Sequence, residues 1–175
     1  MKKASPQRPR SGAKKPVPPF YQPDNYLPEE SVGYLMRQVI TAVGQEIERQ
    51  LAPADLTNAQ WVPLFKLHRK HASTPAELAR VCHLDAGSMT RTLDRLEAKG
   101  LCLRVRSEDD RRVVHIELTP AGVLAAQGIP LVLSNVQNAH LSGFSHDEFE
   151  TLKSYLRRIL DNACQLKSGT QTEPQ

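Results

Sequence analysis

The fold is decided by residues 85–119, which read DAGSMTRTLDRLEAKGLCLRVRSEDDRRVVHIELT. The first part has the pattern of a single helix, because Asp85 is a good N-cap and Gly100 stands where a left-handed residue commonly ends a helix. At about 100° per residue, one side carries the apolar side chains Met89, Leu93 and Leu96, with Ala86 beside them. The opposite side is short, polar and cationic, and it carries Ser88, Arg91 and Arg95.

The polar side of this helix suits contact with duplex DNA. Arginine side chains bind guanine or phosphate in a fork geometry, and hydroxyl groups bind phosphate oxygens. The candidate DNA-binding residues of the helix are Ser88, Thr90, Arg91 and Arg95. Many solvated helices carry a similar face, so the helix alone is weak evidence.

Two runs with the alternation of strands follow the helix. Leu101, Leu103 and Val105 alternate with Cys102, Arg104 and Arg106, and Val114, Ile116 and Leu118 alternate with Val113, His115 and Glu117. The polar loop SEDDRR at residues 107–112 joins the two runs as an antiparallel hairpin. A helix followed at once by a cationic hairpin is the layout of a winged helix-turn-helix. In that fold the helix enters the major groove, and the hairpin tip reaches the narrow, negative minor groove that arginine suits.

The order of short motifs along the chain resembles the MarR family of bacterial transcriptional regulators over most of residues 29–166. The motifs are Leu56-Thr57-x-x-Gln60-Trp61, Thr74-x-x-Glu77-Leu78-Ala79, Thr90-Arg91-x-Leu93-Asp94-Arg95-Leu96-Glu97-x-x-Gly100-Leu101, Asp110-Arg111-Arg112 and Leu118-Thr119-x-x-Gly122. The resemblance implies a mainly α fold, a winged helix-turn-helix with a small β-hairpin wing and long N- and C-terminal dimerisation helices. It also implies a homodimer that binds a double-stranded, pseudo-palindromic operator, most simply as a repressor.

The resemblance assigns the wing motif, Asp-x-Arg, to Asp110 and Arg112, with Thr119 as its anchor. Arg112 would enter the minor groove, oriented by a charge-assisted bond from Asp110, and Arg111 would contact a phosphate. The alternative is that both arginines are solvated loop charges.

Composition and charge are those of a globular domain with a basic arm. The chain has 175 residues, of which 39% are hydrophobic and 24% charged. Residues 1–19 hold six lysines and arginines and no acid, so the net charge of +4 becomes −2 without them. This proline-rich arm either adds phosphate contacts or is a solvated extension without consequence. Because there is no long apolar run and no apolar centre of a signal peptide, we expect a soluble cytoplasmic protein.

The sequence divides into a DNA-binding lobe flanked by helical segments. The expected parts are an arm at 1–28, a helical dimerisation region at 29–56 and 120–166, a winged helix-turn-helix at 57–119 and a frayed tail at 167–175. Regular structure is expected to begin near Pro28, and the first long helix to end at Pro53. Capping boxes are expected at Thr57-x-x-Gln60, Thr74-x-x-Glu77 and Ser145-x-x-Glu148. The helix after Thr119-Pro120 is expected to kink or break at Gly128 and Pro130.

The flanking helices are amphipathic and should cover one another across a two-fold dimer, although their apolar stripes also fit a monomeric core. Catalytic motifs are absent, and the three scattered cysteines suggest neither a disulfide scaffold nor a zinc site. We therefore expect no enzyme, no catalytic residue, no cofactor and no metal. A winged helix that only binds other proteins is the alternative, but such a module would not need the arginines described above.

A small-molecule effector is also implied by the resemblance, because MarR-like proteins bind aromatic carboxylates or phenols between the dimer helices and the DNA-binding lobe. Tyr34, Arg37, Trp61 and His68 are the candidate ligand-binding residues. His68 lies on the inward face of its helix and is alternatively a satisfied core residue.

Overall fold

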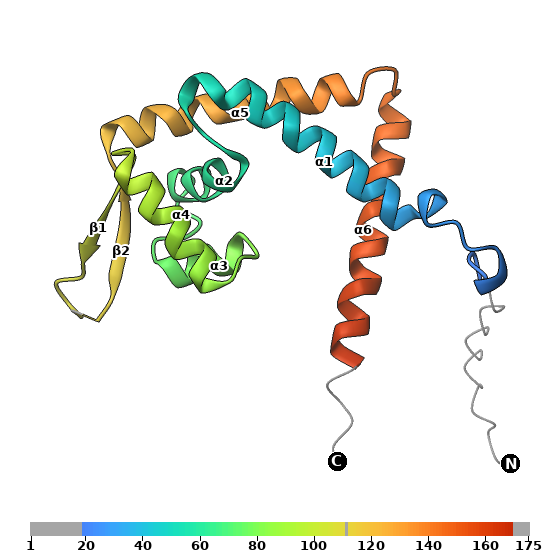
Figure 1. Cartoon of the computed structure of the whole chain (residues 1–175), viewed down its shortest axis with the longest axis horizontal. Helices are drawn as coiled ribbons and strands as arrows, with labels where there is room; N and C mark the ends of the chain where they lie inside the picture. The colour runs from blue at the N-terminus through green and yellow to red at the C-terminus, as the bar shows by residue number, and fades with distance from the viewer. Residues whose placement is uncertain (1–18, 111, 170–175) are drawn as a thin grey trace, which may run out of the picture. The chain divides into compact units, whose positions relative to one another are not determined.

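The computed structural model describes residues 19–110 and 112–169, so most of the basic arm, Arg111 and residues 170–175 lie outside the described part. The elements are α1 (Val32–Leu51), α2 (Asn58–His68), α3 (Pro75–Val81), α4 (Ala86–Ala98), β1 (Cys102–Arg106), β2 (Val114–Leu118), α5 (Pro120–His140) and α6 (His146–Gly169) (Figure 1). Short 3-10 turns occur at Pro23–Asn25, Pro28–Glu30 and Ala52–Ala54. The mainly α fold with one hairpin confirms the expected fold class.

The chain forms two compact units, Met1–Gln38 and Val39–Gln175, and α1 runs through the boundary. In the first unit, the α-helix begins at Val32 and not near Pro28, where only a 3-10 turn forms. The reason is a better cap, since the Ser31 hydroxyl accepts a hydrogen bond from the Tyr34 N–H at 3.2 Å. The Tyr21 hydroxyl accepts another, from the Val32 N–H at 2.9 Å.

The core of the second unit joins α2, α3, α4, α5 and the hairpin. Its most buried large side chains include Leu56, Leu64, Leu78, Met89, Leu93, Leu96, Ile129 and Val136. Three of these, Met89, Leu93 and Leu96, are the residues expected on the inner side of α4, whereas Ala86 beside them is exposed. Burying this side fixes α4 against the lobe and leaves its polar side outward.

The expected helix signals are confirmed. Thr74 and Glu77 form a complete capping box at α3, and Ser145 and Glu148 exchange the same pair of contacts before α6. At α2, the Gln60 side chain accepts from the Thr57 N–H at 3.2 Å. These signals need only residues close in sequence, which is why they can be read without the fold.

A kink or a break was expected in the helix after Thr119, and the break is wrong, because α5 continues through Gly128 and Pro130 to His140. Proline removes one backbone hydrogen bond and disfavours a helix interior. Here Pro130 is exposed, while Ala126, Ile129 and Val136 are fully buried on the other side. Packing of that apolar side holds the helix across the proline.

The hairpin register sets which wing residues face the lobe. Cys102 pairs with Leu118, Arg104 with Ile116 and Arg106 with Val114, and directly paired residues share one face of a sheet. Cys102 and Ile116 are buried, whereas 52% of Leu103 is exposed. The apolar residues of β1 therefore lie on the outer face, and the cysteine and arginine of the same strand face α4.

No helix among residues 19–110 and 112–169 is long and apolar enough to cross a membrane. The same residues contain no group of three or more side chains arranged to hold a metal ion.

Candidate nucleic-acid interface

The helix α4 is fixed at its N-terminus by Asp85. One carboxylate oxygen of Asp85 accepts from the Ser88 N–H at 2.8 Å, and the other accepts from the Ser88 hydroxyl at 2.6 Å. These bonds, the hydroxyl bond first, hold the pKa of Asp85 below its ordinary value. A negative charge there also interacts well with the positive end of the helix dipole.

The outward side of α4 presents the cations that the sequence predicted. Arg91 and Arg95 are exposed, and the Arg91 guanidinium donates to the Ser88 hydroxyl at 3.0 Å. Their guanidinium groups make no ion pair with any residue of the described chain. Two exposed arginines on one helix face that form no ion pair are available for phosphate or guanine.

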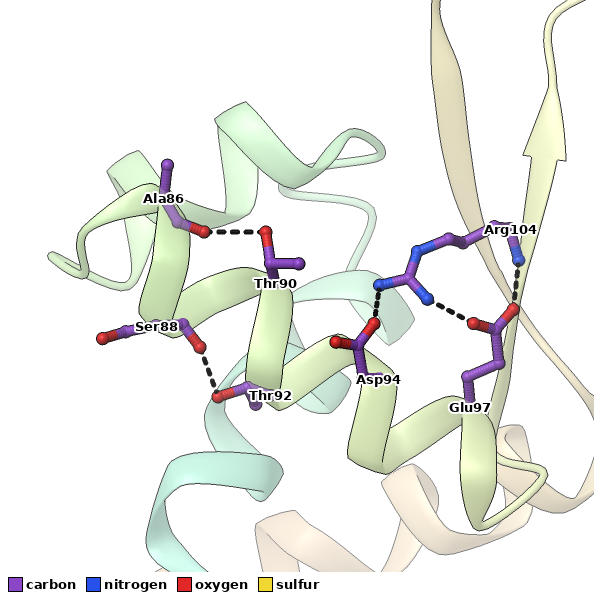
Figure 2. A network of polar contacts seen from close by, with 7 residues as sticks. All are labelled: Ala86, Ser88, Thr90, Thr92, Asp94, Glu97 and Arg104. Carbon is purple, nitrogen blue, oxygen red and sulfur yellow. Dashed lines mark hydrogen bonds and ion pairs between the residues drawn. The ribbon is translucent and has the colours of Figure 1, made fainter.

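The hydroxyl groups of Thr90 and Thr92 are turned back onto the helix (Figure 2). Thr90 donates to the Ala86 carbonyl at 2.9 Å, and Thr92 donates to the Ser88 carbonyl at the same distance. In this rotamer the Thr90 hydroxyl cannot donate to a phosphate, so it would have to rotate to make the predicted contact.

Arg104 joins the wing to α4, a connection that the sequence interpretation missed (Figure 2). Its guanidinium lies 2.6 Å from Asp94 and also pairs with Glu97, whose carboxylate accepts from the Arg104 backbone N–H at 3.2 Å. The two acids are three residues apart, so both project toward β1. That spacing, opposite a strand arginine, is the one sequence signal that pointed to this network.

Lys99 fixes the other end of α4. Its ammonium group lies 3.0 Å from a carboxylate oxygen of Asp55 and donates to the Gln60 side chain at 3.0 Å. It also donates to the Asp55 backbone carbonyl. Asp55 has a left-handed φ of 51° in the turn between α1 and α2. The C-terminal end of α4 is therefore bound to the turn that leaves α1.

At the wing tip, the predicted pairing of Asp110 and Arg112 occurs through the backbone. Asp110 accepts from the Arg112 N–H at 2.9 Å, and no bond between this carboxylate and the exposed Arg112 guanidinium occurs in the described chain. The contact shapes the turn that carries the arginine, and the guanidinium stays available. Arg111 lies outside the described residues.

Thr119 anchors the base of the wing, as predicted. Its hydroxyl donates to the Gly100 carbonyl at 2.6 Å and accepts from the Gly122 N–H at 3.0 Å. It thus connects the end of α4, the end of β2 and the start of α5.

The four predicted ligand-binding residues are divided between the two units. Tyr34 and Arg37 belong to the first unit, and Trp61 and His68 to the second. The half-buried Trp61 donates from its ring N–H to Asn58 at 3.1 Å. His68 is half-buried and lines a cavity with the loop after α2, and Trp61 is not part of that cavity. A shared site for all four residues stays a prediction.

Comparison with known families and structures identifies the lobe. The family model for the MarR family matches residues 56–114, which run from the turn before α2 to the start of β2. Wild-type MarR from E. coli in its apo form is 30% identical, has a TM-score of 0.63, and covers 74% of this chain and 97% of its own. A mutant MarR from E. coli, solved with operator DNA, is 29% identical and has a TM-score of 0.68. It covers 74% of this chain and 93% of its own.

Two further solved structures show the same architecture. The transcriptional regulator PA3341 is 33% identical, has a TM-score of 0.68, and covers 77% of this chain and 99% of its own. BpsR of Bordetella bronchiseptica shares the fold. It is 22% identical, has a TM-score of 0.68, and covers 78% of this chain and 98% of its own. Members of this family are transcriptional regulators and not enzymes, in agreement with the sequence prediction. The chain belongs to the MarR family of DNA-binding transcriptional regulators.

Proposed function

We propose that this chain is a homodimeric repressor that binds a pseudo-palindromic operator and is released by a small aromatic acid or phenol. The observation that carries the DNA-binding part is the outward side of α4, where Arg91 and Arg95 are exposed and form no ion pair in the described chain. The helix under them is fixed by Asp85, Arg104 and Lys99. A rigid helix with outward cations is suited to the major groove.

The contacts that we propose divide into two grooves. Ser88, Thr90, Arg91 and Arg95 approach the major groove, and Arg112 enters the flanking minor groove with Arg111 at a phosphate. Asp110 holds the wing turn through the Arg112 backbone. The operator complex of the E. coli MarR mutant, a relative at 29% identity, supports duplex DNA as the partner. DNA of this kind lies in the bacterial cytoplasm, and we place the protein there.

A homodimer would cover the apolar side chains that α6 leaves exposed. Ile159 is 39% exposed and Leu160 61% exposed, and none of the helix's residues with described side chains is buried. Apolar patches of this kind mark association surfaces, and two-fold dimers are the most common soluble oligomers. Two recognition helices about one DNA turn apart, roughly 10 base pairs, would read a pseudo-palindrome.

The effector part of the proposal rests on side-chain chemistry. Arg37 supplies a cation, Tyr34 and Trp61 supply aromatic rings, and His68 supplies an imidazole. The DNA binding of BpsR, a protein of the same fold, is regulated by 6-hydroxynicotinic acid. To release DNA, the effector must bind the DNA-free form more tightly, and a coupling of about 1 to 3 kcal/mol corresponds to roughly 5- to 150-fold.

Two alternatives make different demands. A constitutive DNA-binding protein would bind the operator equally with and without aromatic acids. A protein-interaction module would bind no DNA, and it would have no use for the two exposed arginines on the outward side of α4.

A mobility shift on the promoter next to the protein's own gene tests the proposal. The wild type should be a dimer by light scattering. In the mobility shift it should bind this duplex in preference to a scrambled duplex. Arg91→Ala and Arg95→Ala should each weaken binding by about 1 to 3 kcal/mol, whereas Arg157→Ala, an exposed arginine of α6, should have no effect. If all three variants bind the duplex equally well, the proposal that α4 contacts DNA is wrong. A shift that no aromatic acid or phenol reverses favours the constitutive alternative.

A further inference from the structure

The Arg91 side chain is held from within its own helix, α4. Its Nη2 group donates to the Ser88 hydroxyl at 3.0 Å, and the same hydroxyl donates to a carboxylate oxygen of Asp85 at 2.6 Å. Since a serine hydroxyl has a single proton, that proton is committed to Asp85, and a lone pair of the oxygen accepts from Arg91. The three side chains therefore form a continuous series of hydrogen bonds along one side of α4.

Ser88 is fixed on both sides of its backbone. Its N–H donates to the other carboxylate oxygen of Asp85 at 2.8 Å, and its carbonyl accepts from the Thr92 hydroxyl at 2.9 Å (Figure 2). Thr92 is buried, so this contact is part of the packed side of the helix. The Ser88 hydroxyl is thus a fixed acceptor, and it restricts the direction in which the Arg91 guanidinium points.

Gly87 leaves room for the guanidinium to lie against the helix. A Cβ built on Gly87 would lie 3.6 Å from Nη1 of Arg91 and 3.3 Å from the Asp85 carboxylate. The guanidinium and the carboxylate therefore flank the same residue in the first turn of α4. Arg95, one turn further along, is different, because its exposed side chain makes no hydrogen bond or ion pair with the residues that the structure describes.

The carboxylate beside Arg91 disfavours a phosphate at this guanidinium. Bonds from Ser88 are the main cause of the lowered pKa of Asp85, and attraction to Arg91 contributes. Asp85 is therefore ionised at neutral pH, and its negative charge repels an anion that approaches the same guanidinium. Asp85 also occupies the Ser88 N–H, a donor of the kind that binds phosphate at the start of a helix. A neutral acceptor is the better partner for Arg91.

Guanine is the neutral partner that suits an oriented arginine. Its N7 and O6 are adjacent acceptors in the major groove, and two N–H groups of one guanidinium bind both. One Arg91 N–H is used on Ser88, and the others remain for this pair. Arg91 lies in the N-terminal half of α4, and that half of a recognition helix contacts base edges. Because the side chain is already held, it loses less rotamer freedom on binding.

We infer that Ser88, oriented by Asp85, is a positioning residue that holds Arg91 to read a guanine of each half-site through N7 and O6. Ser88 acts through Arg91 and does not bind phosphate itself. Arg95, whose side chain is not held in this way, supplies a phosphate contact that is independent of sequence. The inference rests on the proposed placement of α4 in the major groove.

Selection of binding sites from a random duplex library by the full chain is the first measurement. The wild type should enrich sites with a guanine in each half-site that Arg91→Ala no longer selects. Arg95→Ala, the matched control on the same side of α4, should enrich the same sites as the wild type. Anisotropy titration then compares the selected duplex with one in which that guanine is 7-deazaguanine, which lacks the N7 acceptor. The wild type and Arg95→Ala should both bind the 7-deazaguanine duplex about three- to tenfold more weakly.

Ser88→Ala tests the positioning role. Its affinities for the two duplexes should differ by about twofold or less, because Arg91 is no longer held against the helix. Ser88→Thr keeps the hydroxyl and should restore the wild-type ratio. The ratio compares two duplexes with one protein, so partial unfolding of a variant leaves it unchanged. A Ser88 that is only structural, or that binds phosphate, would weaken both duplexes by the same factor.

Three results overturn the inference and leave the proposed function standing, because the protein still binds a defined site. They are a wild-type ratio retained by Ser88→Ala, equal binding of both duplexes by the wild type, and selection of the same guanines by Arg91→Ala. A wild type that enriches no site and binds no duplex refutes the proposed function, and the inference fails with it.

Discussion

The Arg104 guanidinium of β1 lies 2.6 Å from the Asp94 carboxylate of α4, so the strand that begins the wing is bound to the helix that we propose for the major groove. The side chain of Arg104 is 30% exposed and that of Asp94 57% exposed. Glu97 supplies a second carboxylate that pairs with the same guanidinium. A planar guanidinium that pairs with two acids fixes both the distance and the orientation of β1 relative to α4. The helix and the wing therefore keep a set spacing, which two adjacent grooves require.

Arg104→Gln should lower DNA affinity more than it lowers stability. The pair is partly solvent-screened, so unfolding free energy should fall by only about 1 kcal/mol. Operator affinity should fall by about 0.5 to 2 kcal/mol, because a positioning contact between two DNA-binding elements is lost. Arg104→Lys should not restore binding, since an ammonium group cannot reproduce the fork. Combining Arg104→Gln with Asp94→Asn checks the contact: strictly additive losses of operator affinity would show that the two residues act independently.

Gly122 should tolerate no side chain. A Cβ built there would lie 1.8 Å from the Leu101 carbonyl oxygen, which is backbone and cannot turn away. Gly122→Ala should therefore destabilise the fold by about 1 to 3 kcal/mol through overpacking where α5 starts. Gly128→Ala in the same helix meets nothing within 4 Å and should stabilise it by about 0.5 to 1 kcal/mol. Denaturant unfolding of both variants measures the difference, and equal effects would contradict the close approach at Leu101.

Features encoded by neighbouring residues could be predicted from the sequence. The Thr74 and Asp85 caps, the left-handed Gly100 and the outward arginines of α4 need only a helix period and a few hydrogen bonds. The same reasoning failed at Pro130, because the local cost of proline was outweighed by packing of Ile129 on the opposite side. Local rules hold until a tertiary contact outweighs them.

The candidate site was predicted only in part for the same reason. In the sequence Arg104 is one of several cations of the hairpin, and only the strand register turns it toward Asp94 and Glu97. The Lys99 contact with Asp55 spans 44 residues and has no local signal. One cavity is lined both by Lys70, in the loop after α2, and by residues of β2, and sequence spacing cannot show that these come together.

The cap at α4 should make stability depend on acid pH. Asp85 has a pKa below its ordinary value of 3.8, so the carboxylate contributes stability at neutral pH that is lost as the pH falls through its folded value. Asp85→Asn still accepts a hydrogen bond but does not titrate there. The free energy of unfolding of Asp85→Asn should lie below that of the wild type by a constant amount from neutral pH down to about 5, and this difference should shrink near pH 3. Denaturant unfolding at these values is the measurement, and a deficit that grows in acid would contradict the sign.

The Arg112 side chain should contribute to DNA binding and not to folding. The side chain is exposed at the wing tip, so Arg112→Ala should leave unfolding unchanged and weaken operator binding by about 1 to 3 kcal/mol per subunit. Asp110→Ala should weaken binding less, because Asp110 acts by accepting from the Arg112 backbone N–H. Asp109→Ala, the adjacent exposed acid, is the matched control and should not weaken binding. If Arg112 enters a minor groove, its loss should matter most on operators with A/T-rich flanks, where that groove is narrow and strongly negative. Equal losses on A/T- and G/C-rich flanks would instead make Arg112 a phosphate contact, and a normal mobility shift for Arg112→Ala would remove the wing tip from the interface.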